Sequence, residues 1–252
     1  MIIAKNICKR FGDKIILKNI DFVFERSKTN LIIGRSGAGK TVLLKTLIGL
    51  ITPEKGEVWY DDINFYSLNF KEKRELRRKV GMLFQGNALF DSLTIEENIR
   101  FPLDMFTNMT DKEKSKQVSF CLERVDLHDV EKKFPNEISG GMQKRVGIAR
   151  AIVMDPMYLF CDEPNSGLDP KTSIIIDELI KDITHERKIT TVINTHDMNS
   201  VMEIGQKIIL LEDGELAWTG TKDEIMKSSN NRITDFIFAS PFLKSLKEKA
   251  DL

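Results

Sequence analysis

One eight-residue segment constrains the fold of this chain more than any other. Residues 34–41 read GRSGAGKT, a complete G-x-x-x-x-G-K-[ST] pattern between an apolar run that ends at Ile33 and the apolar-periodic stretch 41–50. Glycines at this spacing let the backbone curl so that successive N–H groups face phosphate oxygens. Lys40 can reach the β and γ phosphates, and the hydroxyl of Thr41 can ligate Mg²⁺. We therefore predict a nucleotide-binding loop between a strand and a helix whose positive N-terminal end adds to the anion site.

Short apolar runs that alternate with helical stretches extend this prediction to the whole chain. The strand-like runs are 2–7, 15–24, 30–33, 57–66, 80–84, 157–161, 190–194 and 207–211. Helical spacing marks residues 41–50 and 170–185, and the polar, helical segment 86–155 contains further helices at 111–124 and 141–154. Strands alternating with helices predict a mostly parallel α/β sheet, with 86–155 as a helical insertion between two strand-bearing halves.

Composition excludes several other classes of function. The 252 residues hold 38 Lys plus Arg and 38 Asp plus Glu, so the chain lacks the basic excess of a nucleic-acid partner. Its three cysteines form no CxxC pair, which argues against a zinc or dithiol site and for a reduced, cytosolic protein. The N-terminus does not resemble a signal peptide, and no stretch approaches the length of a membrane span. We expect any membrane function to depend on a partner.

Two carboxylates follow the buried run 157–161 directly. Asp162 is placed to position Mg²⁺, and Glu163 is placed to polarise an attacking water. Without the glycine loop, the same pair would fit a solvent-facing strand end equally well. His196 follows another apolar run, where a histidine is often structural. Its place at the carboxyl edge of the sheet, where α/β proteins gather ligands, favours a contact with the γ-phosphate instead.

A further motif gives the chain a family resemblance. Residues 138–145 read ISGGMQKR, similar to the Leu-Ser-Gly-Gly-Gln signature of the ATP-binding-cassette (ABC) ATPases, which likewise precedes the aspartate strand. The resemblance implies a P-loop NTPase (RecA-like) fold with a mostly parallel sheet, an antiparallel β portion and an inserted helical subdomain. It also implies two composite sites per homodimer, in which the signature of one subunit closes on ATP held by the loop of the other.

The remaining family motifs follow in order along the chain. Phe11 matches the aromatic that stacks on adenine, Gln85 the glutamine that contacts Mg²⁺ and couples to the membrane partner, and His196 the switch histidine. Residues 166–169 match the loop that crosses the dimer interface. The resemblance thus implies catalytic roles for Gln85, Glu163 and His196, and Mg²⁺ contacts for Thr41, Gln85 and Asp162. It implies contacts to ATP for Phe11, Gly34, Arg35, Ser36, Gly37, Ala38, Gly39, Lys40, Thr41, Val42, Ser139, Gly140, Gly141, Asp162 and Asp169.

A narrower resemblance concerns the cargo. Residues 85–103, QGNALFDSLTIEENIRFPL, with Met142 in place of the signature glutamine, look like the ATPases of Mla/Mce-type phospholipid transporters of Gram-negative envelopes. In this resemblance, apolar residues after Gln85 receive a coupling helix of the membrane subunit; the alternative is that they fill the helical core. An importer or exporter ATPase for another substrate, a soluble cassette ATPase and a non-hydrolysing nucleotide-binding module remain alternatives. Glu163 argues against the last.

The resemblance divides the chain and places it in the cell. We expect a nucleotide-binding domain over 1–225, with its core in 1–85 and 156–225 and its helical subdomain in 86–155. It implies an ATPase peripheral to the cytoplasmic face of the inner membrane, bound to an integral permease. The tail, 226–252, contains Phe236, Ile237, Phe238, Phe242, Leu243 and Leu246. Such apolar density predicts a dimer contact or a small regulatory partner, and docking onto the chain's own core is the alternative.

Overall fold

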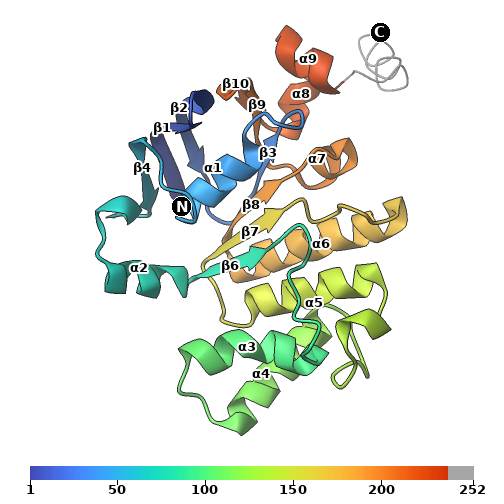
Figure 1. Ribbon diagram of the computed structural model, residues 1–252. Coiled ribbons are helices and arrows are strands. Elements are labelled where there is room, and N and C mark those ends of the chain that lie inside the picture. Colours follow the sequence, from blue (N-terminus) through green and yellow to red (C-terminus); the bar gives the residue numbers. More distant parts are fainter. Residues whose placement is uncertain (238–252) are drawn as a thin grey trace.

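The computed structural model describes residues 1–237, and the predicted alternation of strands and helices is confirmed (Figure 1). The strands are β1 (Ile2–Phe11), β2 (Lys14–Phe24), β3 (Thr29–Ile33), β4 (Lys55–Tyr60), β5 (Ile63–Asn64), β6 (Val80–Leu83), β7 (Tyr158–Asp162), β8 (Thr190–Asn194), β9 (Lys207–Glu212) and β10 (Glu215–Gly220). The α-helices are α1 (Lys40–Leu47), α2 (Phe70–Arg77), α3 (Ile95–Phe106), α4 (Asp111–Arg124), α5 (Gly140–Ile152), α6 (Pro170–Arg187), α7 (Met198–Ile204), α8 (Lys222–Lys227) and α9 (Asn231–Ile237).

Two sheets form the framework. The larger has the strand order β10-β9-β3-β8-β7-β6 and is parallel except for the β10–β9 pair at one edge. The smaller sheet, β2-β1-β4-β5, is antiparallel. Every residue of β3, β7 and β8 is buried, as expected for central parallel strands covered on both faces. The prediction of a mostly parallel core with an antiparallel portion is therefore correct.

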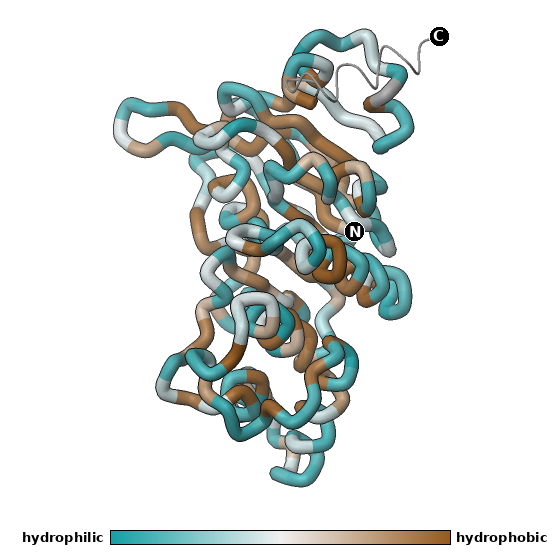
Figure 2. The backbone as a smooth tube through the Cα atoms, turned by 90° about the vertical axis from the view of Figure 1, so that its right-hand side faces the viewer, coloured by the Kyte–Doolittle hydropathy of each residue, from teal (hydrophilic) through white to brown (hydrophobic). Residues whose placement is uncertain are grey.

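The two faces of the large sheet belong to two different hydrophobic cores. Along β3, Ile32 points into the core shared with α1, α2 and the small sheet, whereas Leu31 and Ile33 point into the core shared with helices α3 to α9. This alternation follows from the two-residue period of a strand. Helix α1 lies between the two sheets, and α5 and α6 cover the opposite face (Figure 1). Apolar segments consequently concentrate inside the molecule (Figure 2).

The predicted helical insertion contains α3, α4 and α5, which pack on one another below the sheet in Figure 1. Capping boxes start two of these helices, Thr94 with Glu97 and Thr110 with Glu113, and each cap stabilises its helix by about 1 kcal/mol. The core of these helices is continuous with that of the large sheet, through Leu83 and Val146 among others. The exact boundaries of the predicted subdomain, 86 and 155, stay a prediction.

The start of the predicted tail docks onto the chain itself. In α9, Ile233 and Ile237 are buried in the core of the large sheet, and Phe236 packs against it. This packing agrees with the alternative of docking onto the chain's own core, and a dimer or partner contact of the tail stays a prediction. Phe238, Phe242, Leu243 and Leu246 lie outside the described residues. Within residues 1–237, none of the helices combines the length and apolar character that crossing a bilayer requires.

Candidate functional site

The carboxyl ends of three neighbouring strands meet at one edge of the large sheet. The glycine loop 34–41 follows β3, Asp162 ends β7, and Asn194 ends β8, and these strands are adjacent and parallel. A cavity of about 650 Å³ opens at this edge, which we call the phosphate-loop cavity. It is lined by Lys14, Ile16, Ser36, Gly37, Gly39, Lys40, Thr41, Val42, Gln85, Glu163 and His196. Residues distant in sequence thus share one site, as the strand ends predicted.

Two glycines of the loop are required by close packing and by backbone conformation. Gly34 has a φ of +148°, and a Cβ there would lie 2.3 Å from the carbonyl oxygen of Leu211. Gly39 has a φ of +103°, and its Cβ would lie 2.9 Å from the side chain of Leu17. The loop therefore passes close to neighbouring backbone before α1 begins. The first N–H groups of α1 lack intrahelical acceptors, which makes this end suited to an anion.

Lys40 brings a buried cation to the same place. Its side chain is largely buried, and Nζ donates to the carbonyl oxygens of Gly34, at 2.8 Å, and Arg35, at 3.1 Å. Burial lowers the pKa of the Lys40 ammonium, while the carboxylates of Glu163 and Asp162 oppose this lowering. The ammonium is thus held against the loop by neutral oxygens that an incoming phosphate can replace as acceptors.

A cluster of oxygen ligands suited to Mg²⁺ lies beside the loop. The hydroxyl of Thr41 donates to Oδ1 of Asp162 at 3.3 Å, and Nδ2 of Asn194 donates to the same carboxylate oxygen at 2.6 Å and to Oγ1 of Thr41 at 3.1 Å. Asp162 and Asn194 face each other in the register of β7 and β8. Hydroxyl and carboxylate oxygens are ligands that Mg²⁺ prefers, together with phosphate oxygens. Oδ1 of Asn194 is buried without a partner in the described structure.

Glu163 is held in place from two sides. Nε2 of Gln85 donates to Oε2 of Glu163 at 2.9 Å, and Nδ1 of His196 lies 3.1 Å from Oε1. The backbone of Glu163 has a left-handed φ of 50°, and its N–H donates to the carbonyl of Asn194 at 2.9 Å. This conformation costs an L-residue about 1–2 kcal/mol, and such strain clusters where a side chain must be aimed. The carboxylate is therefore held in one orientation in the lining of the phosphate-loop cavity.

A comparison with protein families agrees with this geometry. The model of the family described as "ABC transporter" matches residues 17–166, from within β2 to just past Glu163. The chain belongs to the ABC transporter family. It is an ATPase subunit of that family, as predicted.

Several relatives cover nearly the whole chain but differ in cargo. A probable ribonucleotide transport ATP-binding protein of Mycobacterium leprae is 37% identical over 93% of this chain and 67% of its own length. The methionine import protein MetN of Carboxydothermus hydrogenoformans is 39% identical over 99% of this chain and 74% of its own length. The intermembrane phospholipid transport protein MlaF of Haemophilus influenzae is 33% identical over 94% of this chain and 90% of its own length. For other mycobacterial relatives the chain spans 65% of their length.

Solved ABC structures share the fold. The ATP-binding cassette MJ0796, solved as a dimer in a post-hydrolysis state bound to ADP and Pi, is 35% identical with a TM-score of 0.80, over 88% of this chain and 99% of its own. The CbiO1 subunit of Clostridium perfringens has a TM-score of 0.84 over 100% of this chain and 98% of its own, at 24% identity. The predicted P-loop NTPase fold of an ABC ATPase is therefore correct.

The other predicted ATP contacts lie apart from the phosphate-loop cavity in this chain. Ser139 caps α5, its Oγ accepting from the N–H of Met142 at 3.3 Å, and Asp169 caps α6 through Thr172. Phe11 is half exposed at the end of β1. Of the described residues that line the phosphate-loop cavity, none is Phe11, Asp169 or a signature residue, 139–141. Arg35 and Ala38 line a smaller cavity beside β9.

Sequence reasoning missed three polar groups around the site. The prediction does not include Asn194, although this residue ends the strand that precedes His196. Lys144, buried in α5, donates through Nζ to the carbonyl oxygen of Gln85 at 2.6 Å. Asp177 on α6 accepts from Nδ2 of Asn165 at 2.9 Å, and burial raises its pKa to about 6. A strand-end position could have flagged Asn194, whereas no local signal marks Lys144 or Asp177.

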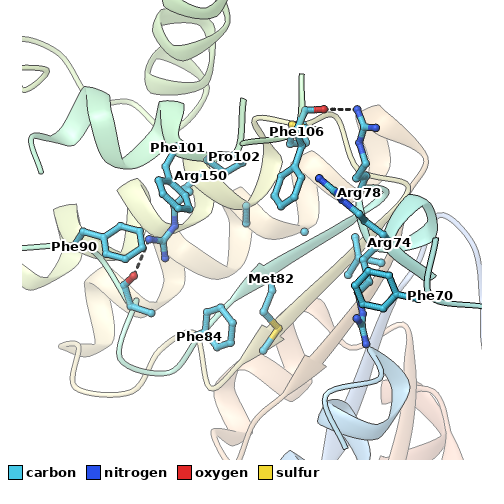
Figure 3. Close-up of a pocket in the computed structure, with 16 residues that line it drawn as sticks. Phe70, Arg74, Arg78, Met82, Phe84, Phe90, Phe101, Pro102, Phe106 and Arg150 are labelled. Carbon is cyan, nitrogen blue, oxygen red and sulfur yellow. Dashed lines mark hydrogen bonds between the residues drawn. The ribbon is translucent and has the colours of Figure 1, made fainter. Parts of the chain in front are cut away.

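A second cavity, the apolar groove, lies on the other side of the loop that carries Gln85. Its volume is about 640 Å³, and phenylalanines and arginines from α2, α3, α5 and the loop after β6 surround it (Figure 3). The lining residues are Phe70, Arg74, Arg77, Arg78, Val80, Gly81, Met82, Phe84, Ala88, Phe90, Phe101, Pro102, Phe106, Arg150, Ala151 and Met154. None of these described lining residues is acidic. The groove thus offers aromatic surface with positive charge at its rim.

Proposed function

We propose that this ABC ATPase hydrolyses MgATP as a homodimer to drive a membrane permease that moves phospholipid. The observation that carries the hydrolytic part is Glu163, fixed by Gln85 and His196 beside the loop that holds Lys40. A positioned carboxylate next to a phosphate site suits activation of an attacking water. A module that only binds nucleotide would not need this arrangement.

Each group has a role in the proposed reaction. Lys40 and the N–H groups of the loop would bind the phosphates, and Thr41 and Asp162, which share a hydrogen bond, would hold Mg²⁺. Bound Mg²⁺ would neutralise charge that develops between the β and γ phosphates. Glu163 accepts the proton of the attacking water, and His196, whose side chain is largely exposed, faces the γ-phosphate. Gln85 keeps the carboxylate oriented before water attacks.

The signature requires a second subunit in this proposal. Ser139 opens α5 on the surface, away from the phosphate-loop cavity, so it can meet a phosphate only from another copy. The dimeric structures of MJ0796, at 35% and 36% identity, support a homodimer. Phe11 and Asp169 would then contact ATP or the facing subunit. A small regulatory protein bound at the C-terminal tail, 226–252, stays part of the proposal.

The apolar groove is the proposed docking site for the permease. Its exposed phenylalanines would receive an apolar segment, and its arginines would pair with acidic groups on that segment. The ATPase would then lie peripherally on the cytoplasmic face of the inner membrane. The resemblance of residues 85–103 to Mla/Mce ATPases and the MlaF relative support phospholipid as cargo. Methionine is the second candidate, because a MetN relative is 39% identical.

Purification from the native membrane tests the docking. Arg74→Glu places a negative charge in the groove, whereas Lys71→Glu makes the same change on the exposed part of α2 outside it. We expect the native chain and Lys71→Glu, but not Arg74→Glu, to co-purify with an integral membrane subunit. Mass spectrometry of the purified complex should then find bound phospholipid; methionine in its place would refute the lipid assignment. Equal recovery of all three chains would refute the docking site.

A further inference from the structure

The turn at residues 85–88 contributes to both cavities. Gln85 lines the phosphate-loop cavity, whereas Ala88 lines the apolar groove. Asn87 and Ala88 adopt left-handed φ values of 59° and 51°, which are uncommon for residues other than glycine. Asn87 also keeps a buried side-chain oxygen without a partner in the described structure. Backbone hydrogen bonds from Asn87 to Phe84, at 2.9 Å, and from Ala88 to Gly86, at 2.6 Å, support the turn locally, and contacts from outside it add to them.

Those contacts come from one face of α5. Nζ of Lys144 donates to the carbonyl oxygen of Gln85 at 2.6 Å. Arg150 donates from Nη1 to the carbonyl of Ala88 at 2.7 Å and from Nη2 to that of Asn87 at 2.5 Å. Positions 144, 147 and 150 follow at intervals of three and share a helix face. Gly147 lies between the two cations, where an added Cβ would approach the side chain of Leu83 to 2.7 Å.

The charges of Lys144 and Arg150 are not explained by ion pairs. Within residues 1–237, no salt bridge includes Lys144 or Arg150, and the polar contacts of both go to the backbone of the turn. Burial is the largest cause that lowers the pKa of each; for Lys144, attraction by Cys161, Asp162 and Glu163 opposes it. A buried charge is costly unless it is well hydrogen-bonded, and an apolar side chain would pack as well. A buried lysine and a half-buried arginine that donate to three carbonyls of one turn, those of Gln85, Asn87 and Ala88, indicate a specific use.

We propose that Lys144 and Arg150 form a two-point clamp that positions the turn 85–88, so that the side chain of Gln85 reaches Glu163. Lys144 fixes the backbone from which the side chain of Gln85 extends, and Arg150 fixes the other end of the turn. Both are positioning residues, because they act through Gln85. The clamp rests on the proposed function of Glu163.

A double-mutant cycle on the isolated full chain tests the clamp. Lys144→Met keeps the length and removes the donor, and we expect kcat for ATP to fall about tenfold, the effect of one lost hydrogen bond from a charged group, with KM changed less than about twofold. In a Gln85→Ala background the same substitution should change kcat by less than about twofold. Lys144→Arg keeps a donor and should recover most of the activity. Lys114→Met is the matched control, since Lys114 is a partly buried lysine that pairs with Asp104 at 2.8 Å.

Several results would overturn the clamp. An equal tenfold loss in both backgrounds would show that Lys144 acts independently of Gln85, and a raised KM at constant kcat would assign it to binding. If Lys144→Met fails to fold, Arg150→Lys replaces it in the cycle, because a lysine cannot reach both carbonyls; we expect about a threefold loss of kcat that disappears without Gln85. Full turnover in Glu163→Gln would refute the proposed function itself. Loss of turnover in Glu163→Gln with none in Lys144→Met would refute the clamp alone.

Discussion

Two helices of this chain begin at a glycine-rich segment, α1 after the loop 34–41 and α5 after Ser139. At the start of α1 the loop itself supplies the buried Lys40, neighbouring strands supply two carboxylates and an asparagine, and Gly34 and Gly39 are packed against other backbone. Around the start of α5, Ser139 and Gly140 are exposed, and a Cβ added to Gly140 would meet nothing within 4 Å. Both starts suit an anion by their N–H groups and dipole. Only the start of α1 is surrounded by groups that could do chemistry, and we propose that the start of α5 completes a composite site on another copy.

The largest effect on turnover should come from a change at Glu163, the proposed catalytic carboxylate, which lies near the start of α1 and, within residues 1–237, has no counterpart near the start of α5. Glu163→Gln should lower turnover by at least the ~10²-fold typical of a lost general base while ATP binding persists. Steady-state ATPase assays and nucleotide-binding titration measure both. Glu178→Gln on the exposed part of α6 is the control and should keep normal turnover. Near-normal hydrolysis by Glu163→Gln would remove the chemical distinction between the two helix starts.

The two starts should also differ in how they bind ATP. Lys40→Ala and Ser139→Arg should both abolish hydrolysis, because the composite site needs both. The isolated Lys40→Ala monomer should bind ATP about 10- to 100-fold more weakly, since it loses charge-assisted hydrogen bonds to phosphate. The Ser139→Arg monomer should bind ATP normally in the same titration. Equal loss of affinity in the two variants would place the signature and the loop on one phosphate within one chain.

The smallest effect concerns the packing of α6 beside the site. Burial raises the pKa of Asp177 from an ordinary value of 3.8 to about 6, and hydrogen bonds from Ser200 and Asn165 oppose this rise. Between these values the folded state binds more protons than the unfolded state, so Asp177 makes the free energy of unfolding fall as pH rises from 4 to 6. Asp177→Asn removes this loss. Relative to the native chain, the variant should gain about 2 kcal/mol between pH 4 and pH 7 in urea unfolding.

A constant stability difference between the two chains across this pH range would contradict the assignment. The same outcome would mean that Asp177 is ionised throughout, and that the network of Asn165, Asp177 and Ser200 behind the catalytic edge carries a full negative charge. The comparison at each pH uses the same denaturation protocol, so contributions from the other carboxylates cancel to first order.

Local sequence patterns predicted the strands, the helices and the site at the strand ends. This was possible because a glycine loop, an apolar run or a terminal carboxylate can be recognised from a few consecutive residues. The rule that neighbouring parallel strands end at the same edge of a sheet was enough to predict that four residues lie close together: Thr41, Asp162, Glu163 and His196. Asn194 was identified only from the structure, in which the register of β7 and β8 places it beside Asp162. Lys144 depends on how α5 packs against the end of β6, and no sequence period encodes that packing. The roles of the signature residues and of Phe11 cannot come from one chain, because their partner is another copy.

The measurement that tests the composite site most directly is the mass in solution of a variant that binds ATP but does not hydrolyse it. In MgATP, Glu163→Gln should elute in light scattering at twice the monomer mass of 28.9 kDa, with ATP held between α1 of one copy and α5 of the other. Adding Ser139→Arg to the same chain should keep it at 28.9 kDa with ATP bound. If the double variant forms the dimer as readily as Glu163→Gln, or if Glu163→Gln stays monomeric when saturated with MgATP, the signature is not the second half of the site.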